Sequence, residues 1–533
     1  MKFSRRIFNK NGALLLLSSS ISPLLIKEVR QRFGDDEVRV AKAKNLNFIN
    51  KLDTNLPPET ELLVPSYLGN DQRRFYGRGI PQGLNLINKF NLGSGKTNVF
   101  GSIQVWAGAG WTGQPAIIKD QEKLYLIIGA YDHHLRKIDL VNNQEVWRYK
   151  FDDVIKGSST VYIQPGASEP NRVVILQGSR LGFNNSPQSN QPVPSFRAIS
   201  FRTGQELWRL NIRKTDSYSR DNDSSAIDLG NGQIFNVGEN AIGYFLNSYT
   251  GAAKNKENML QPEVLAEVQL YQAEDVPKHR RNLVAESSPS RLNDRIFVAA
   301  GSGHFYGISI TTRKIVWDFY VGSDLDGTIA ISKDEKLFCA VEKQYIPGNG
   351  GVLKLDPSKP PAESVDWFLP TSNIPFGNWK GGIVGSVTLN DEYRSEELPA
   401  LFATNAIDGN LYIGSQTITT GTKVRGPLLQ KSYDTPLIVF KQRVGPSIST
   451  PIFTDGNRLV TAGYDGIYLF QLYFDPAQPD EPNILLNDRG DPWHLVVEQV
   501  GRFMPGGSFE STPVVWDGLI RICSKDGFMY TLG

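Results

Sequence analysis

Short runs of apolar and β-branched residues, separated by glycines and polar pairs, recur along most of the chain. Residues 286–322 contain three of them in succession, at 295–299, 304–309 and 314–320, with Gly301-Ser-Gly303 between the first two. Runs of this length and composition, bounded by turn residues, predict antiparallel β-strands. Because no long stretch has a helical period, the pattern predicts a chain of β-meanders.

These meanders are spaced regularly, and the spacing identifies a repeat. The step from a proline to a tyrosine is 17 residues in each of three segments, Pro289 to Tyr306, Pro451 to Tyr468 and Pro513 to Tyr530. Repeats of roughly 40–60 residues with four short strands are typical of β-propellers. Eight repeats follow residue 111, and the last supplies only three strands.

The missing strand is expected near the other end of the chain. Residues 86–90 are strand-like, and they can complete the eighth repeat and close the ring, which protects the sheet edges. The prediction is therefore all-β: an eight-bladed β-propeller of four-stranded antiparallel blades over residues 86–533, closed by an N-terminal strand. Trp147, Trp208, Trp317 and Trp367 fall in presumed outer strands, where large aromatic side chains can pack between blades.

The N-terminal 26 residues have the features of an export signal. A basic start precedes an apolar run from Ala13 that is too short to span a bilayer. Residues 4–10, Ser-Arg-Arg-Ile-Phe-Asn-Lys, resemble the twin-arginine (Tat) motif except at Asn9, where leucine is usual; an ordinary Sec signal is the alternative. Residues 27–85 are polar and irregular and predict an arm or linker. We expect a periplasmic or cell-envelope protein with no membrane span beyond an uncleaved signal.

Composition narrows the functional classes further. Of the 533 residues, 21% are charged, and the formal net charge is only +2, so nothing indicates a nucleic-acid partner. The two cysteines, Cys339 and Cys523, lie far apart inside apolar runs. They are predicted to be buried free thiols, because two cysteines cannot form a disulfide scaffold.

The repeat also resembles a known family. Segments such as Thr203-Gly204…Trp208, Asp465-Gly466…Tyr468 and Asp526-Gly527…Tyr530 resemble the repeat of pyrroloquinoline quinone (PQQ) enzymes. This quinoprotein-like family includes dehydrogenases and also non-catalytic members, among them an assembly lipoprotein of the outer membrane. Its dehydrogenases carry adjacent cysteines and hold calcium with Glu, Asn and Asp.

Neither feature of the dehydrogenases can be placed on this sequence. The chain has no adjacent cysteines, and the calcium ligands do not map onto it, so no catalytic residue is assigned. The cofactor is unknown: the resemblance implies PQQ with calcium, and the residues do not support it. Too few histidines cluster for zinc, and Asp324-Leu-Asp326-Gly327 is interpreted as a turn, so no metal site is assigned.

The loops before the inner strands and the turns after the second strands are expected to share one face around the central channel. They are rich in charged and aromatic residues, and they also contain Asp223 and Glu239. The predicted ligand-binding residues at this channel mouth are Trp111, Arg220, His279, Arg281, Glu286, His304, Asp324, Asp326, Trp379, Lys380 and Glu510. A solvated rim with ion pairs is the alternative interpretation.

Two functions remain open from the sequence. The favoured one is an exported, non-catalytic propeller that binds a small polar molecule or an exported protein partner, since a fold alone does not confer activity. The alternative is a divergent quinoprotein dehydrogenase that uses PQQ and calcium to oxidise an alcohol or a sugar.

Overall fold

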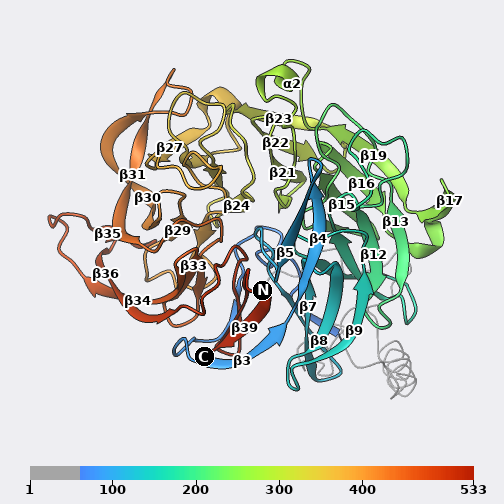
Figure 1. The fold of residues 1–533 in the computed structure, drawn as a ribbon. Coiled ribbons are helices and arrows are strands. Elements are labelled where there is room, and N and C mark those ends of the chain that lie inside the picture. The colour runs from blue at the N-terminus through green and yellow to red at the C-terminus, as the bar shows by residue number, and fades with distance from the viewer. Residues whose placement is uncertain (1–59) are drawn as a thin grey trace, which may run out of the picture. The chain divides into compact units, whose positions relative to one another are not determined.

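The predicted meanders form a closed ring of eight blades in the computed structural model, which describes residues 60–533 (Figure 1). The expected export signal at 1–26 and the first part of the expected arm, 27–59, lie outside the described residues. Each blade is an antiparallel sheet; in blades 1 to 7 its strands follow in chain order, whereas blade 8 combines three C-terminal strands with one from the N-terminal side. The eight-bladed β-propeller predicted from the repeat is therefore confirmed.

Four strands make up each blade, numbered from the first repeat. Blades 1 and 2 contain β6 (Ala116–Asp120), β7 (Lys123–Gly129), β8 (His134–Asp139) and β9 (Gln144–Lys150), then β10 (Thr160–Ile163), β11 (Val173–Gly178), β12 (Phe196–Ser200) and β13 (Glu206–Leu210). Blades 3 and 4 contain β14 (Ile227–Gly230), β15 (Gln233–Gly238), β16 (Ile242–Asn247) and β19 (Glu263–Gln269), then β20 (Ser290–Leu292), β21 (Arg295–Ala300), β22 (His304–Ser309) and β23 (Ile315–Tyr320). Blades 5 and 6 contain β24 (Ala330–Ile331), β25 (Leu337–Val341), β26 (Gly351–Leu355) and β27 (Val365–Pro370), then β28 (Thr388–Leu389), β29 (Leu401–Asn405), β30 (Asn410–Arg425) and β31 (Ser432–Arg443). Blades 7 and 8 contain β32 (Ile452–Thr454), β33 (Arg458–Gly463), β34 (Gly466–Pro476) and β36 (Pro492–Phe503), then β37 (Val514–Trp516), β38 (Leu519–Cys523), β39 (Phe528–Leu532) and β3 (Leu86–Asn91).

The remaining elements are short. They are β1 (Thr60–Val64), β2 (Gly77–Arg78), the hairpin of β4 (Ser94–Val99) and β5 (Ser102–Ala107), the hairpin of β17 (Lys254–Lys256) and β18 (Met259–Gln261), β35 (Leu485–Leu486), α2 (Asp275–Lys278), and the 3₁₀ turns η2 (Thr250–Ala252) and η3 (Pro361–Glu363). None of the helices in residues 60–533 is long and apolar enough to cross a membrane.

The two ends of the propeller meet in blade 8. Strand β3 pairs antiparallel with β39, with Phe90 opposite Met529, and Figure 1 shows the blue strand β3 beside the red strand β39. Because the outer strand of the last blade comes from the N-terminal side, the ring closes as the sequence predicts. Separating β3 from β39 would therefore remove a strand from blade 8 and open the ring at the same time.

Tryptophans connect successive blades. The indole N–H groups of Trp147, Trp208, Trp317 and Trp367 donate to backbone carbonyl oxygens of the following blades, those of Phe201, Ser248, Lys359 and Gln416. Each tryptophan lies on the fourth strand of its blade, as predicted. Burial of the ring together with a satisfied N–H makes each of them a joint between neighbouring sheets.

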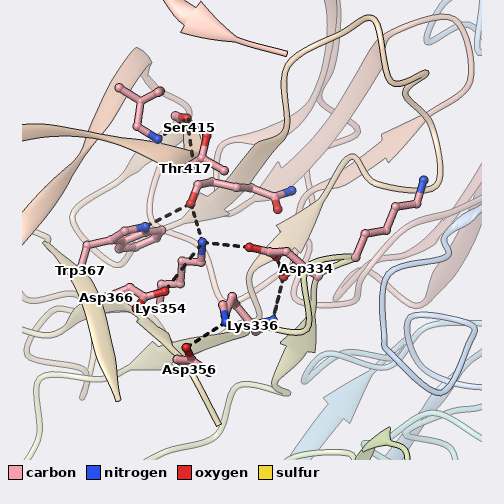
Figure 2. Close-up of polar contacts among 12 residues, drawn as sticks. Asp334, Lys336, Lys354, Asp356, Asp366, Trp367, Ser415 and Thr417 are labelled. Carbon is pink, nitrogen blue, oxygen red and sulfur yellow. Dashed lines mark hydrogen bonds and ion pairs between the residues drawn. The ribbon is translucent and has the colours of Figure 1, made fainter. Parts of the chain in front are cut away.

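The joint between blades 5 and 6 contains a buried charge as well (Figure 2). The Gln416 carbonyl oxygen accepts from the Trp367 indole at 3.2 Å and from the Lys354 ammonium at 3.0 Å. Lys354 is also within 3.3 Å of Asp334. A lysine this deeply buried is stable only when its ammonium is fully hydrogen-bonded and paired with a carboxylate, as here.

The segment before β3, expected to be irregular, includes two strands and fills the channel. β1 pairs with β6, and β2 pairs in parallel with β37. Between them, the Tyr67 hydroxyl lies within hydrogen-bonding distance of Ser386, Thr450 and Thr512, on blades 6 to 8. We call residues 65–78 the channel segment. It also bonds to Gln114, Val161, Ser225, Arg291 and Ile331, on blades 1 to 5.

Candidate functional site

A belt of hydroxyl side chains joins the starts of the inner strands. Five backbone N–H groups, one in each of blades 3 to 7, donate to a hydroxyl of the next blade: Ser225 to Ser288, Ser288 to Thr328, Thr328 to Ser386, Ser386 to Thr450, and Thr450 to Thr512, at 2.8–3.3 Å. These hydroxyls include those of the repeated Ser/Thr-Pro motif. These bonds hold blades 3 to 8 at matching heights, and the Ser225 hydroxyl joins blade 2 to them by donating to Ser158 O at 2.9 Å, so residues at the same offset from the belt lie around the channel at one height.

The residue two positions before each belt hydroxyl determines the chemistry of that ring. On blades 3, 4 and 5 it is Asp223, Glu286 and Asp326. On blade 2 it is Lys156, which precedes Ser158, whose hydroxyl accepts from the Gln114 N–H at 2.5 Å. Three carboxyl groups and one ammonium therefore follow one another around one side of the channel.

Further carboxyl groups converge on this side from the neighbouring loops and turns. Together we call them the acidic cluster: Asp221, Asp223, Glu239, Glu286, Asp324, Asp326 and Glu342. Carboxylate oxygens of Asp223, Glu239 and Glu286 all lie within 4.8 Å of one another. Glu239 comes from the β15–β16 turn and Glu342 follows β25, so the predicted sharing of one face by inner-strand loops and second-strand turns is what brings these groups together.

Lys156 is the central cation of the cluster. Its ammonium contacts Asp223, and it lies 3.0 Å from Glu239 and 3.8 Å from Asp221. Burial alone would lower the pKa of Lys156, but Asp223 and Glu239 raise it well above the usual value, so the group stays charged. Arg180 pairs with Asp221 at 2.8 Å.

The other four carboxyl groups have no ion pair within residues 60–533. They are Glu286, Asp324, Asp326 and Glu342. Burial raises the pKa of Glu286 to about 7, with a further rise from Glu239. Burial also raises the pKa values of Asp324, Asp326 and Glu342 well above their usual range, and the neighbouring acids add to the effect. Such groups are either protonated or in need of a cation.

Blades 6 and 7 are apolar at this height, whereas blade 8 carries Glu510, which pairs with Lys525. At the offset of the acids, blades 6 and 7 carry Val384 and Ile448, which form a buried cluster with Trp111 and Trp379 packed against it. The two indoles stack with their centroids 6.2 Å apart. Trp111 links the two sides, because its indole N–H donates to Glu286 at 2.5 Å.

The structure places the predicted site residues in two groups. Trp111, Glu286, Asp324, Asp326 and Trp379 meet at or beside the acidic cluster, and the exposed Lys380 lies close enough to lower the pKa of Glu342 slightly. The others have contacts of their own. Arg281 is exposed, and Glu510 pairs with Lys525 at 3.1 Å and accepts from Tyr464 at 2.6 Å.

Three further predicted residues serve the fold around them. The buried Arg220 guanidinium donates to Ile212 O at 2.6 Å, Ser189 O at 2.9 Å and Asn211 Oδ1 at 3.2 Å. His304 lies between Asp318, at 2.6 Å, and Asp275, at 3.3 Å. His279 is fully buried beside Tyr345, and burial lowers its pKa to about 4, so it is neutral.

Sequence reasoning missed Lys156, Asp221 and Glu342. Lys156 and Asp221 precede inner strands as the predicted residues do, and Glu342 follows a second strand. The usable signal is the offset of two residues from the hydroxyl of each inner strand, which Lys156, Asp223, Glu286 and Asp326 share. The offset indicates that these residues lie at one height only when the hydrogen bonds of the belt between blades are known.

The cofactor that the quinoprotein resemblance implies fits this site only in part. Clustered carboxylates are the oxygen donors that calcium prefers. PQQ itself carries three carboxylates, whereas the cluster has seven acidic side chains around Lys156, so its charge opposes the quinone. Cys339 and Cys523 are free, buried, and in β25 and β38 of different blades.

A separate pocket of about 200 Å³ lies between blades 4 and 5 and the β30–β31 hairpin. It is lined mainly by apolar residues of blade 4 and of the β30–β31 hairpin, including Tyr320, Leu428 and Tyr433, and Lys431 is its one charged lining residue. No residue of the acidic cluster lines this pocket, and its lining within residues 60–533 contains no carboxyl group.

Comparisons with known proteins assign no family to this chain. No protein-family model matches the sequence, and no curated protein does. Among solved structures, BamB from Moraxella catarrhalis is 14% identical with a TM-score of 0.47, and the match covers 84% of this chain and 97% of that one. The computationally designed protein Ika8 is 12% identical with a TM-score of 0.45, over 80% of this chain and 99% of that one. At these identities the likeness concerns the fold alone.

Proposed function

We propose that this chain is an exported, non-catalytic binding module with a PQQ-like repeat, and that its ligand is a cation bound at the acidic cluster. The observation that carries the proposal is the set of four buried or half-buried carboxyl groups, Glu286, Asp324, Asp326 and Glu342, that have no ion pair in the described part of the chain. Keeping several carboxylates out of water is costly unless a cation neutralises them.

The surroundings of the cluster support binding at this end of the ring. The channel segment occupies the channel beside the belt, so a ligand approaches from the side of the acidic cluster. Glu286 and Asp326 remain half-exposed and can meet it first. A small cation, or a basic side chain of an exported partner protein, has the complementary charge.

Calorimetric titration of the purified full chain tests this proposal. We would use calcium chloride, spermidine and a hexa-arginine peptide in turn. Saturable binding of at least one probe is expected, and the double variant Asp324→Asn/Asp326→Asn should lose it. The control is Glu392→Gln, a carboxylate already paired with Arg74 at 2.8 Å. The proposal is wrong if no probe binds, or if the double variant binds as well as the unmodified chain.

The dehydrogenase alternative is distinguished by adding PQQ. We expect no saturable binding of PQQ alone, because the cluster and the quinone carry charges of the same sign. Dye-coupled oxidation of an alcohol or a sugar after loading with PQQ and calcium would overturn the non-catalytic assignment.

A further inference from the structure

We propose that Asp223, Glu239 and Glu286 form a seat for a hard divalent cation of the calcium type, which enters in exchange for the ammonium of Lys156. This inference rests on the proposed function, because it names the class of cation that the acidic cluster takes. It concerns a metal without the quinone.

The first argument is geometric. One carboxylate oxygen from each of the three residues lies within 4.8 Å of the other two. Oxygens bound to one calcium ion at 2.3–2.6 Å are separated by no more than about twice that distance, roughly 5 Å. Asp223 and Glu239 come from blade 3 and Glu286 from blade 4, so the seat spans a joint that the hydroxyl belt holds.

The second argument concerns Asp223 itself. Its side chain is buried, only 2% exposed, and within residues 60–533 its Oδ1 has no hydrogen-bond partner. Its one polar contact is the ammonium of Lys156. A buried carboxylate normally receives several hydrogen bonds, so Asp223 has coordination capacity that the rest of the protein does not use.

The third argument is charge and donor chemistry. When the three carboxyl groups are ionised, they and the Lys156 ammonium carry a net charge of −2, which a divalent cation neutralises. All the donors are oxygens, and none of the five histidines of the chain is in the triad, which favours calcium or magnesium over zinc. Lys156 already shows that a cation is stable among these oxygens, and its flexible stem lets the ammonium withdraw toward Asp221, 3.8 Å away.

Trp111 provides a spectroscopic reporter for the seat. Its indole N–H donates to Glu286, so the ring lies directly beside one of the proposed ligands. Terbium(III) binds calcium seats and emits when a neighbouring indole transfers excitation energy to it. Terbium added to the full chain should therefore give tryptophan-sensitised emission that saturates with one ion per chain and decreases when calcium is added.

Matched variants distinguish the proposed metal ligands from carboxylates that do not bind the ion. Glu239→Gln keeps the shape but removes a donor charge, and we expect it to weaken calcium and terbium binding roughly 10- to 100-fold. Asp488→Asn, an exposed partner of Arg394, should leave both unchanged. Equal affinities for Glu239→Gln and the unmodified chain would overturn the assignment.

Replacing Lys156 gives the second test. Lys156→Met removes the competing cation, so calcium should bind at least about tenfold more tightly, and the melting temperature should rise with calcium concentration. If Lys156 is only a structural partner, the variant loses stability and calcium does not restore it, which overturns the exchange.

The outcomes also distinguish this inference from the proposed function. If spermidine or the arginine peptide binds at the cluster while calcium and terbium do not, the divalent seat is wrong and the cation-binding module stands. If no cation binds, both are wrong.

Discussion

Replacement of Arg73 by methionine tests whether the channel segment holds the ring together. Arg73 is only 1% exposed and lies at the inner ends of several blades. Its guanidinium donates to Pro289 O at 2.8 Å, to Ser66 Oγ at 2.8 Å, to Tyr67 O at 2.7 Å and to Ser225 O at 3.3 Å. One side chain therefore connects the segment to blades 3 and 4.

The expected cost follows from those four bonds. Hydrogen bonds from a charged donor contribute about 1.5–3 kcal/mol each, and each buried acceptor left without a donor costs about 1–3 kcal/mol. The opposing term is the desolvation of the guanidinium, which lowers the pKa of Arg73 to about 10 and disappears in the variant. We expect a net loss of roughly 3–5 kcal/mol, typical of breaking a buried charged network.

The adjacent residue is a matched control. Arg74 carries the same side chain but is 14% exposed, and it makes one ion pair with Glu392 and one hydrogen bond to Ile331 O at 2.7 Å. Arg74→Met should cost about 1–2 kcal/mol, because a partly exposed pair is weakened by solvent.

Urea unfolding followed by tryptophan fluorescence measures the difference. With a slope of about 3 kcal/mol per molar urea, Arg73→Met should lower the midpoint by about 1 M or more, and Arg74→Met by about half of that or less. If the two variants have the same midpoint, or Arg73→Met unfolds like the unmodified chain, the channel segment does not stabilise the propeller through this network.

Four further predictions concern other parts of the chain. Burial and neighbouring charges raise the pKa values of Asp223 to about 6, Glu286 to about 7 and Glu239 to about 8. The folded protein therefore binds more protons than the unfolded chain between about pH 4 and 8, and its melting temperature in chelator should fall as the pH rises through this window. A melting temperature that stays constant or rises would contradict these pKa shifts. Gly204→Ala should lower the free energy of unfolding by about 2 kcal/mol, because Gly204 has φ of +70° and an added Cβ would lie 2.7 Å from the Trp147 ring. The control is Gly251→Ala in the similar Thr-Gly turn, where an added Cβ has no atom within 4 Å and the melting temperature should hardly change. Cys339 and Cys523 are buried, and burial raises the pKa of the Cys523 thiol to about 12, so a thiol reagent should label neither until the protein is unfolded, and fast labelling of the native chain would refute their burial. Arg5→Lys/Arg6→Lys keeps the charge of the N-terminal segment but should abolish export if the signal is of the Tat type, while unchanged cell fractionation would favour a Sec signal.

The fold was predictable because its signals are local. Strand length, the alternation of apolar residues and the glycine-containing turns each act over a few residues, and the proline-to-tyrosine step repeats them in register. Ring closure by β3 followed from counting strands, since the last repeat had three. The joints at Trp208 and Trp367 were predictable for the same reason, because a large aromatic on an outer strand has only the next blade to pack against.

The site was only partly predictable, because groups far away in the sequence bind some of the side chains that were expected at the channel mouth. Arg220 was expected at the channel mouth, but backbone carbonyls of Ser189 and Ile212 bind its guanidinium. His304 was expected there too, and Asp275 and Asp318 hold its ring. Neither pair of partners has a sequence spacing that marks it in advance.

The sequence by itself determined an all-β ring of eight blades, where the ring closes, and which tryptophans join the blades. The tertiary structure alone decided that Lys156, Asp223, Glu286 and Asp326 stand at one height, because the hydroxyl belt sets that height through hydrogen bonds between blades. It also decided that residues 65–78 lie in the channel, because their contacts are with all eight blades and none of those contacts is local in sequence. The repeat pattern predicts the position of a residue within its own blade, whereas a binding site at the centre of the ring depends on contacts between residues of different blades.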